Sequence, residues 1–282
     1  MGDQRLRTGW DRGAHHYRVS TPFPVSTWVS WPGDHGRLRR EAPLGPAMVV
    51  DAPTVPPRTD PASSAITLSA VGGGVDGLGF VLLAGLFTAH ITGNTVKTGI
   101  DIAQLNLSRA FVDAFPIAMF VVGAFAGALL RDVMAHRVPR PRIPVLAVSA
   151  VLLVAFVGAG AVLQAGRAPP SGSLSFYLLA ALATASMGVQ NAAKPLFAGR
   201  PVRTFMTGTL TDCAEALASG ATAHGAARRD RLRQAGLLFA VWFAYLAGGA
   251  VVGAAALHFG TIAAVLPACG VLAALALEWR GG

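Results

Sequence analysis

Long apolar runs, separated by short polar stretches, dominate the chain after residue 65. Helices of about 20 residues are needed to cross the roughly 30 Å hydrocarbon core of a bilayer. Six runs reach that length: residues 66–87, 111–130, 143–164, 174–193, 235–257 and 259–277. The pattern therefore predicts an all-α, polytopic membrane helical bundle with about six transmembrane helices.

Two further segments are compatible with helices but are more polar than the six runs. Residues 88–107 contain one histidine, one lysine and one aspartate, and residues 203–223 contain one aspartate and one glutamate. Such side chains are costly in contact with lipid. We expect two polar helices, broken or re-entrant, that are buried in the protein or line a cavity.

The first 65 residues have a different composition. They hold half of the 18 prolines of the chain and no sustained apolar period, so they cannot bury enough surface to offset the entropy of ordering. We predict a disordered, Pro-rich cytoplasmic tail at residues 1–65 and a transmembrane domain at residues 66–280. No apolar core typical of a cleaved secretory signal precedes residue 66.

Composition agrees with a membrane protein and narrows the function. Hydrophobic residues make up 53% of the chain and charged residues 13%, where soluble domains carry roughly 25% charged residues. The net charge of +9 comes from arginines in the tail and in short loops, so we expect the lipid bilayer as partner and no nucleic acid. Two cysteines and the absence of catalytic or phosphate-binding motifs predict no enzyme, no cofactor and no metal.

Arginine placement predicts the orientation. The loop between the second and third runs and the loop between the fourth and fifth are rich in arginine, whereas the connections after the third and the fifth runs carry only Arg167 and His258. Positive loops stay in the cytoplasm. We therefore expect a multi-pass protein of the inner (plasma) membrane with both termini cytoplasmic.

The chain contains an internal repeat. An offset of 115 positions superimposes four pairs without a gap: Gly73 on Gly188, Asp76 on Asn191, Thr92 on Thr207 and Gly93 on Gly208. The small-residue faces at residues 123–127 and 249–253 occupy corresponding places in the second and fifth runs. Because each half, residues 66–164 and 174–278, contains three spans, we expect a 3+3 inverted repeat of the kind found in many transporters.

Two motifs identify a resemblance. Residues 74–80 read GVDGLGF and residues 85–96 read GLFTAHITGNTV, and their counterparts are GVQNA at residues 188–192 and VRTFMTGTLTD at residues 202–212. Over roughly residues 65–280 the chain resembles the YoaK-like family of uncharacterised bacterial membrane proteins, a domain of unknown function. The resemblance implies a membrane fold and no established activity.

Polar residues within these motifs are the candidate substrate- or ion-binding residues. Asp76 lies halfway along the first run, where an unpaired charge costs several kcal/mol, so it is either a proton or ion site or a buried hydrogen-bonding group between the repeats. The full candidate set is Asp76, His90, Thr92, Gly93, Asn94, Asn191, Thr207, Gly208 and Asp212. The inverted plan places Thr92 and Gly93 on the outer side and Thr207 and Gly208 on the inner side.

The function expected from these features is transport of a small solute, coupled to a proton or an ion, through a midplane site between the halves. A channel is the first alternative, because two oppositely oriented polar helices can also line one pore. A non-transporting membrane scaffold or partner subunit is the second, with the small-residue faces as contact surfaces, which also allow a homo-oligomer. The sequence leaves the solute, the coupling ion and the oligomeric state open.

Overall fold

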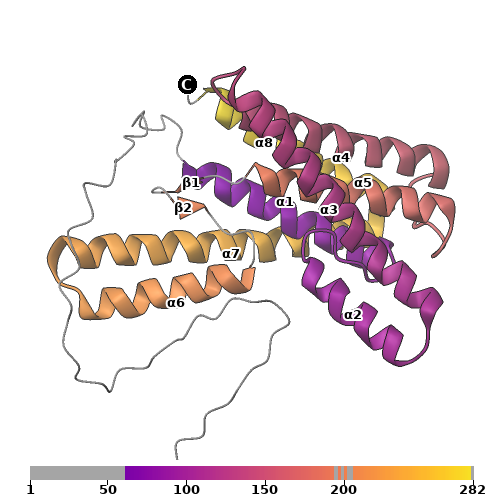
Figure 1. Ribbon diagram of the computed structural model, residues 1–282, viewed down its shortest axis with the longest axis horizontal. Coiled ribbons are helices and arrows are strands. Elements are labelled where there is room, and N and C mark those ends of the chain that lie inside the picture. The colour runs from indigo at the N-terminus through magenta and orange to yellow at the C-terminus, as the bar shows by residue number, and fades with distance from the viewer. Residues whose placement is uncertain (1–60, 194–195, 198–199, 202–205, 281–282) are drawn as a thin grey trace, which may run out of the picture. The chain divides into compact units, whose positions relative to one another are not determined.

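The computed structural model describes residues 61–193, 196–197, 200–201 and 206–280, and these form helices joined by short connections (Figure 1). The helices of the predicted apolar runs are α1 (Pro61–Leu82), α3 (Leu107–Ala135), α4 (Arg142–Gln164), α5 (Leu174–Ala192), α7 (Gly225–Phe259) and α8 (Val265–Arg280). The two polar segments form the helices α2 (Ile91–Ala103) and α6 (Met206–Thr222), and the remaining elements are the 3₁₀ helix η1 (Gly260–Ala264) and the paired strands β1 (Leu196–Phe197) and β2 (Arg200–Pro201). The predicted all-α class is confirmed.

Four helical stretches in the described part of the chain are long and apolar enough to cross a membrane. They are Ala62–Leu82, Leu107–Ala135, Arg142–Gln164 and the continuous stretch Gly225–Arg280, which contains α7 and α8. The expected span at residues 174–193 is α5, which falls outside this set. Most of α5 is buried between other helices, so its surface does not need to be as apolar as a lipid-facing one.

Several predicted boundaries were wrong, each for a local reason. The run at residues 66–87 was expected to be one span, but α1 already begins at Pro61 and ends at Leu82. It ends there because Ala84 and Gly85 adopt positive φ angles of 55° and 77°, which a right-handed helix cannot accommodate. The rest of the predicted tail, residues 1–60, lies outside the described residues.

The helix that contains the fifth predicted span is longer than the span. The span was expected to begin at residue 235, whereas α7 begins at Gly225 and its arginine-rich first turns are helical. At 1.5 Å per residue its 35 residues extend about 52 Å, which is well beyond the roughly 30 Å of hydrocarbon. The N-terminal part of α7 therefore extends past the apolar region, and α6 packs along it (Figure 1).

The most extensive packing joins helices that are not neighbours in the sequence. Helix α1 packs most extensively on α7, and α3 packs most extensively on α5. Helix α8 lies between α1 and α4, and α4 also packs on α5. The helices of the two polar segments lie on neighbours in sequence, α2 on α3 and α6 on α7 (Figure 1).

Glycines allow the backbones of the crossing helices to touch. A Cβ added at Gly73 would overlap the Tyr245 carbonyl oxygen, and one added at Gly248 would overlap that of Ala70. The α3–α5 pair has the same kind of contact. There Gly123 faces the carbonyl oxygen of Ala185 and Gly188 faces that of Phe120. Close backbone approach at small residues is the usual way in which helices associate inside a membrane.

Arginines bind the carbonyl groups that helix ends leave unpaired. Arg131 donates to the Ala192 carbonyl at 3.1 Å, and Arg142 donates to Ala193 at 3.0 Å, both at the end of α5. Arg140 donates to the carbonyls of Glu278 and Trp279 at the end of α8, at 3.0 and 2.8 Å. These cations also complement the negative end of each helix dipole.

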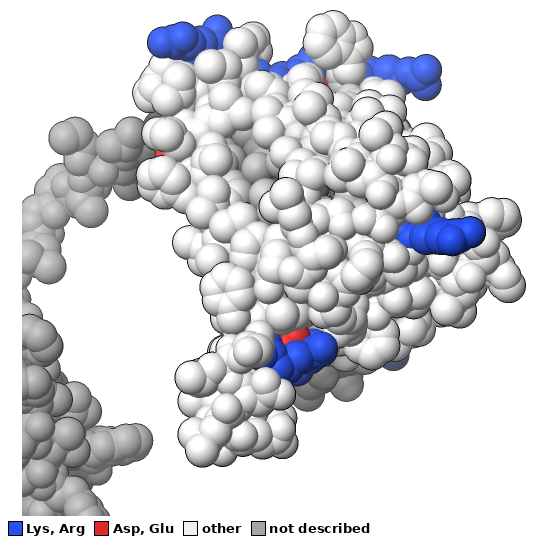
Figure 2. All heavy atoms as spheres, turned by 90° about the vertical axis from the view of Figure 1, so that its right-hand side faces the viewer, with Lys and Arg blue, Asp and Glu red and all other residues white. Residues whose placement is uncertain are grey.

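One face of the helical bundle is almost free of charge (Figure 2). Lys and Arg side chains are few there: they lie along the upper edge, at mid-height on the right and near the lower edge, where one blue group sits beside red acidic atoms. The large exposed apolar side chains include Phe111, Val121 and Phe125 of α3 and Val151 and Val154 of α4. An apolar belt between charged margins is the surface that a bilayer requires.

The close approach of the α1 and α7 backbones predicts different effects on stability for two glycine substitutions in α7. Gly248→Ala should destabilise the fold by about 1–3 kcal/mol, because the new Cβ forces α1 away from α7. Gly236→Ala should be neutral or stabilising by up to about 1 kcal/mol, because nothing lies within 4 Å of its added Cβ. Reversible unfolding in mixed micelles measures both changes, and equal losses would contradict the proposed crossing.

Candidate functional site

The carboxylate of Asp76 is the centre of the most polar buried region described. Its Oδ1 accepts from the Thr88 amide at 2.6 Å, the Thr88 hydroxyl at 3.1 Å and the Ala89 amide at 2.6 Å. Its Oδ2 accepts from the His90 amide at 3.0 Å and from the Tyr245 hydroxyl. Asp76 is 4% exposed, so five donors take the place of water around this carboxylate.

This arrangement joins three parts of the molecule. Asp76 lies in α1, the three amides lie immediately before α2, and Tyr245 lies in α7, 169 residues further along the chain. Amides that precede a helix lack partners within it, and a carboxylate satisfies them well. Asp76 therefore holds the start of α2 against α1 and, through Tyr245, against the second half of the chain.

Asn94 binds the same connection from the other side. Its side-chain oxygen accepts from the Phe87 amide at 3.0 Å, and its side-chain nitrogen donates to the Phe87 carbonyl at 2.6 Å. Asn94 has no exposed surface. Its amide group therefore replaces the backbone partner that Phe87 would have in a helix or a sheet.

Charged side chains complete the binding of residues 83–90. Lys97 donates to the Gly85 carbonyl at 2.8 Å and to Asp113 Oδ1 at 2.9 Å. Arg109 donates to the Ala84 carbonyl at 2.9 Å, and its Nε lies 3.6 Å from Asp113 Oδ2. Asp113 is 1% exposed, so a buried carboxylate positions two cations that bind the end of α1.

The other first-half candidates lie nearby but are more open. The Thr92 hydroxyl is 3.2 Å from His90 Nε2 on the exposed side of α2. Gly93 lies under the Phe87 ring, where an added Cβ would come within 2.8 Å of the ring. His90, Thr92 and Gly93 thus border the connection, and the His90–Thr92 pair is the part of the candidate set that faces outward.

The second-half candidates lie elsewhere. Asn191 is half-buried at the end of α5, Thr207 is exposed on the first turn of α6, and Gly208 and Asp212 are half-buried on α6. Helix α6 packs on α7, with the Cys213 thiol 3.4 Å from the Ala235 carbonyl. Since α2 packs on α3 and α6 on α7, the two Thr-Gly segments do not come together in one site.

Sequence reasoning missed several residues of this region. Tyr245 lies in an apolar run and gave no signal, and Asp113 was counted within an expected span. Gln190 was paired with Asn191 as a possible counterpart of Asp76, and its side chain donates to the Leu68 carbonyl at 3.0 Å between α5 and α1. A search for charged residues flanking the short helix would have found Asp113, since it lies 16 positions after Lys97.

The described residues contain no group of three or more His, Cys, Asp or Glu side chains able to hold a metal ion. What the region offers instead is a buried, hydrogen-bonded carboxylate beside a short polar helix within a bundle of apolar helices. The fold and this region define a multi-pass helical membrane protein.

Within that class, the chain belongs to a family described as protein of unknown function (DUF1275), whose family model matches residues 64–277. The predicted family resemblance is thereby confirmed. No curated protein and no solved structure matches the chain.

The buried charge network predicts the effect of removing its lysine. Lys97→Met leaves the Asp113 carboxylate buried with Arg109 as its remaining cation, and should destabilise the fold by about 3 kcal/mol, the lower end of the range for a broken buried pair. The double variant Lys97→Met/Asp113→Asn should regain part of that loss. Unfolding in mixed micelles provides the double-mutant cycle, and strictly additive losses would argue against the pair.

Asp101, in α2 and outside the apolar spans, adds a pH-dependent effect. Desolvation and then the neighbouring Asp113 raise the pKa of Asp101 above its ordinary value of 3.8, and its Oδ2 is buried without a hydrogen-bond partner. A raised pKa means that the folded state holds this proton more tightly than the unfolded state, so the stability contributed by Asp101 falls as pH rises above about 4.

Asp101→Asn should therefore raise the melting temperature at pH 7 and change it little near pH 4. The asparagine carries no charge next to Asp113 and supplies a donor in its place. Melting curves of both proteins across that pH range measure the effect. A constant difference between them at all pH values would contradict the assignment to Asp101.

Proposed function

We propose that this protein is a proton-coupled transporter of a small solute, built as a 3+3 inverted repeat. In this proposal, proton binding at Asp76 controls opening on the outer side of the membrane. The order of elements supports the repeat. A helix of an apolar run, a helix of a polar segment and two further helices of apolar runs occur in that order from α1 to α4, and again from α5 to α8. Transporters of this plan carry solute by movement of one half against the other.

Packing between the halves adds to this support. The Gly73–Tyr245 contact has the Gly188–Phe120 contact as its counterpart. The Ala70–Gly248 contact likewise matches the Ala185–Gly123 contact. In both pairs of contacts, the residues on α1 and α5 are 115 positions apart in the sequence, and their partners on α3 and α7 are 125 positions apart. A two-fold relation between the halves requires such a consistent pair of offsets. Gly123 thus corresponds to Gly248, one position from the expected Gly249.

The observation that carries the coupling step is the set of five donors around Asp76. Bonds to a carboxylate are charge-assisted and roughly twice as strong as neutral ones. Proton binding would convert Asp76 into a weak acceptor and release both the start of α2 and Tyr245. The connection between α1 and α2 would then open toward its exposed side, where His90 and Thr92 lie.

The packing favours this function over a channel. A shared pore would need the two polar helices to lie along one path, whereas α2 packs on α3 and α6 packs on α7. A scaffold remains the second candidate because one observation favours it: the Asp76 carboxylate is fully bonded within the protein. In a scaffold Asp76 would stabilise the fold at every stage and would never exchange a proton.

Purified protein in liposomes under an imposed proton gradient tests the proposal. Internal pH is followed while amines, acids, sugars and drugs are added in turn. The wild type should show a solute-dependent pH change that Asp76→Asn abolishes, because an amide cannot take up a proton there. Asp132→Asn is the matched control, since Asp132 is an exposed carboxylate of α3 paired with Arg131, and it should behave as the wild type.

Two results would contradict the proposal. Solute flux that persists unchanged in Asp76→Asn would show that this carboxylate does not couple transport to protons. A folded wild-type protein without any solute-dependent signal would favour the scaffold. The melting temperature of Asp76→Asn separates loss of coupling from loss of fold.

A further inference from the structure

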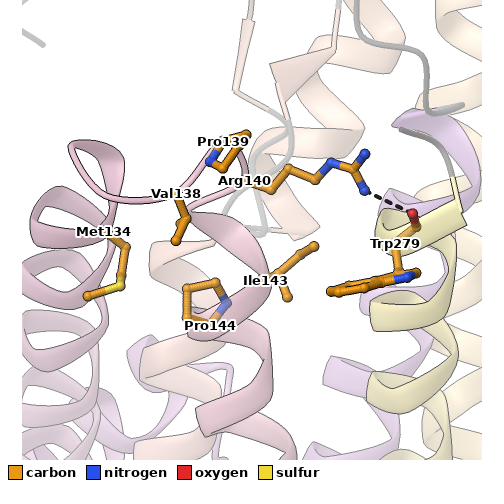
Figure 3. Close-up of a pocket in the computed structure, with 7 residues that line it drawn as sticks. All are labelled: Met134, Val138, Pro139, Arg140, Ile143, Pro144 and Trp279. Carbon is orange, nitrogen blue, oxygen red and sulfur yellow. Dashed lines mark hydrogen bonds between the residues drawn. The ribbon is translucent and has the colours of Figure 1, made fainter.

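A cavity of 630 Å³ lies where three helices end, away from Asp76. Its lining comes from the end of α3, the turn after it, the start of α4 and the end of α8: Met134, Val138, Pro139, Arg140, Ile143, Pro144 and Trp279. Figure 3 shows Met134 and Val138 on one side and the Trp279 ring on the other, with Ile143 and Pro144 between them. The lining is apolar except for one guanidinium group.

The position of this cavity along the spans matters. Leu107–Ala135 and Arg142–Gln164 are both span candidates, and the cavity lies at the connection between their ends. The end of the stretch Gly225–Arg280 contributes Trp279. Trp and Arg side chains at span ends are typical of the interface between hydrocarbon and lipid headgroups. Trp279 is 72% exposed, which suits a ring that contacts lipid.

No carboxylate of the described residues neutralises the charge at the rim. Arg140 donates through one nitrogen to two α8 carbonyls, as the dashed line to Trp279 in Figure 3 illustrates. The Glu278 carboxylate is bound by Arg142 at 2.9 Å and by Ser64 at 2.9 Å. Among the described residues no carboxylate is bonded to Arg140. The start of α4 adds positive potential, and Pro141 before it offers no side-chain acceptor.

We propose that this cavity is a binding site for an anionic phospholipid. The phosphate group lies at Arg140 and the start of α4, and an acyl chain lies along Met134, Val138, Ile143 and the Trp279 ring. Basic pockets between transmembrane helices on one side of the membrane bind acidic headgroups in this way. The apolar lining explains why a lipid fits the site and a free phosphate ion does not.

Fluorescence quenching of Trp279 in nanodiscs tests the site in the full-length protein. Nanodiscs contain the same mole fraction of dibrominated phosphatidylglycerol or dibrominated phosphatidylcholine, and the Trp279→Phe protein is subtracted to isolate Trp279. The anionic lipid should quench the wild type at lower mole fraction than the zwitterionic lipid. Arg140→Gln should reduce this preference about fivefold, the effect of one interfacial basic side chain.

Two controls distinguish binding of anionic lipid in this cavity from general attraction of anionic lipid to the positively charged surface. Arg137→Gln removes the same charge from the same turn without touching the cavity lining, and it should keep the preference. Ile143→Phe enlarges a side chain in the cavity while Arg140 remains and adds no tryptophan to the signal, and it should lose the preference even if Arg140→Gln fails to fold. Equal losses in Arg137→Gln and Arg140→Gln, an undiminished preference in Ile143→Phe, or no preference in the wild type would each overturn the proposal.

Discussion

The backbone contact between α1 and α7 is the constraint on which the rest of the described structure depends. Gly73 brings α1 against the carbonyl of Tyr245, and Gly248 brings α7 against the carbonyl of Ala70. Because the backbones touch there, the Tyr245 hydroxyl reaches Asp76, less than one turn beyond Gly73. Lipid tails give helices no hydrophobic reason to associate, so close contact of this kind has to hold the halves together.

The polar motif of the first half has a clear role in satisfying its own backbone. Residues 83–90 are neither helix nor strand, and irregular backbone at the edge of a membrane needs partners from the protein. Asp76 and Asn94 bind the amides of this connection, and Lys97 and Arg109 bind its carbonyls. Residues that look like ligands in the sequence are therefore directed first at the chain itself, and transport would use bonds that already hold the fold.

The sequence predicts the helical class and the order of apolar and polar segments better than the ends or the packing partners of the helices. The length of each apolar run predicts where a membrane helix lies, but not where it ends. Residues 83–87 continue the first apolar run although they lie after the end of α1, because Leu83 and Leu86 of this irregular connection are buried. Gly73 and Gly188, which the sequence matches, both lie where close backbone contact leaves no room for a side chain, as the proposed repeat requires. A single offset of 115 aligns the two halves only as far as α2 and α6, because the packing of the following helices corresponds to an offset of 125. The sequence therefore paired Gly123 with Gly249, whereas the packing pairs it with Gly248. Tyr245 stayed hidden because its partner is 169 residues away.

Under the proposed repeat, the two halves share a backbone plan and differ in the chemistry at α2 and α6. Between α2 and α3 the contact includes Asp101, near Asp113 and Lys97. Applying the two offsets leads from Asp101 to Ala216 and from Asp113 to Leu238, which pack together with Cys213 in an apolar cluster between α6 and α7. Charges thus contribute to the contact of α2 with α3, and apolar burial contributes to that of α6 with α7. Under the proposed coupling, the carboxylate that binds the start of α2 is Asp76, whereas the equivalent position in the second half is the uncharged Asn191. Proton binding at Asp76 would then act on the first half, while the proton and solute gradients would set the direction of net transport.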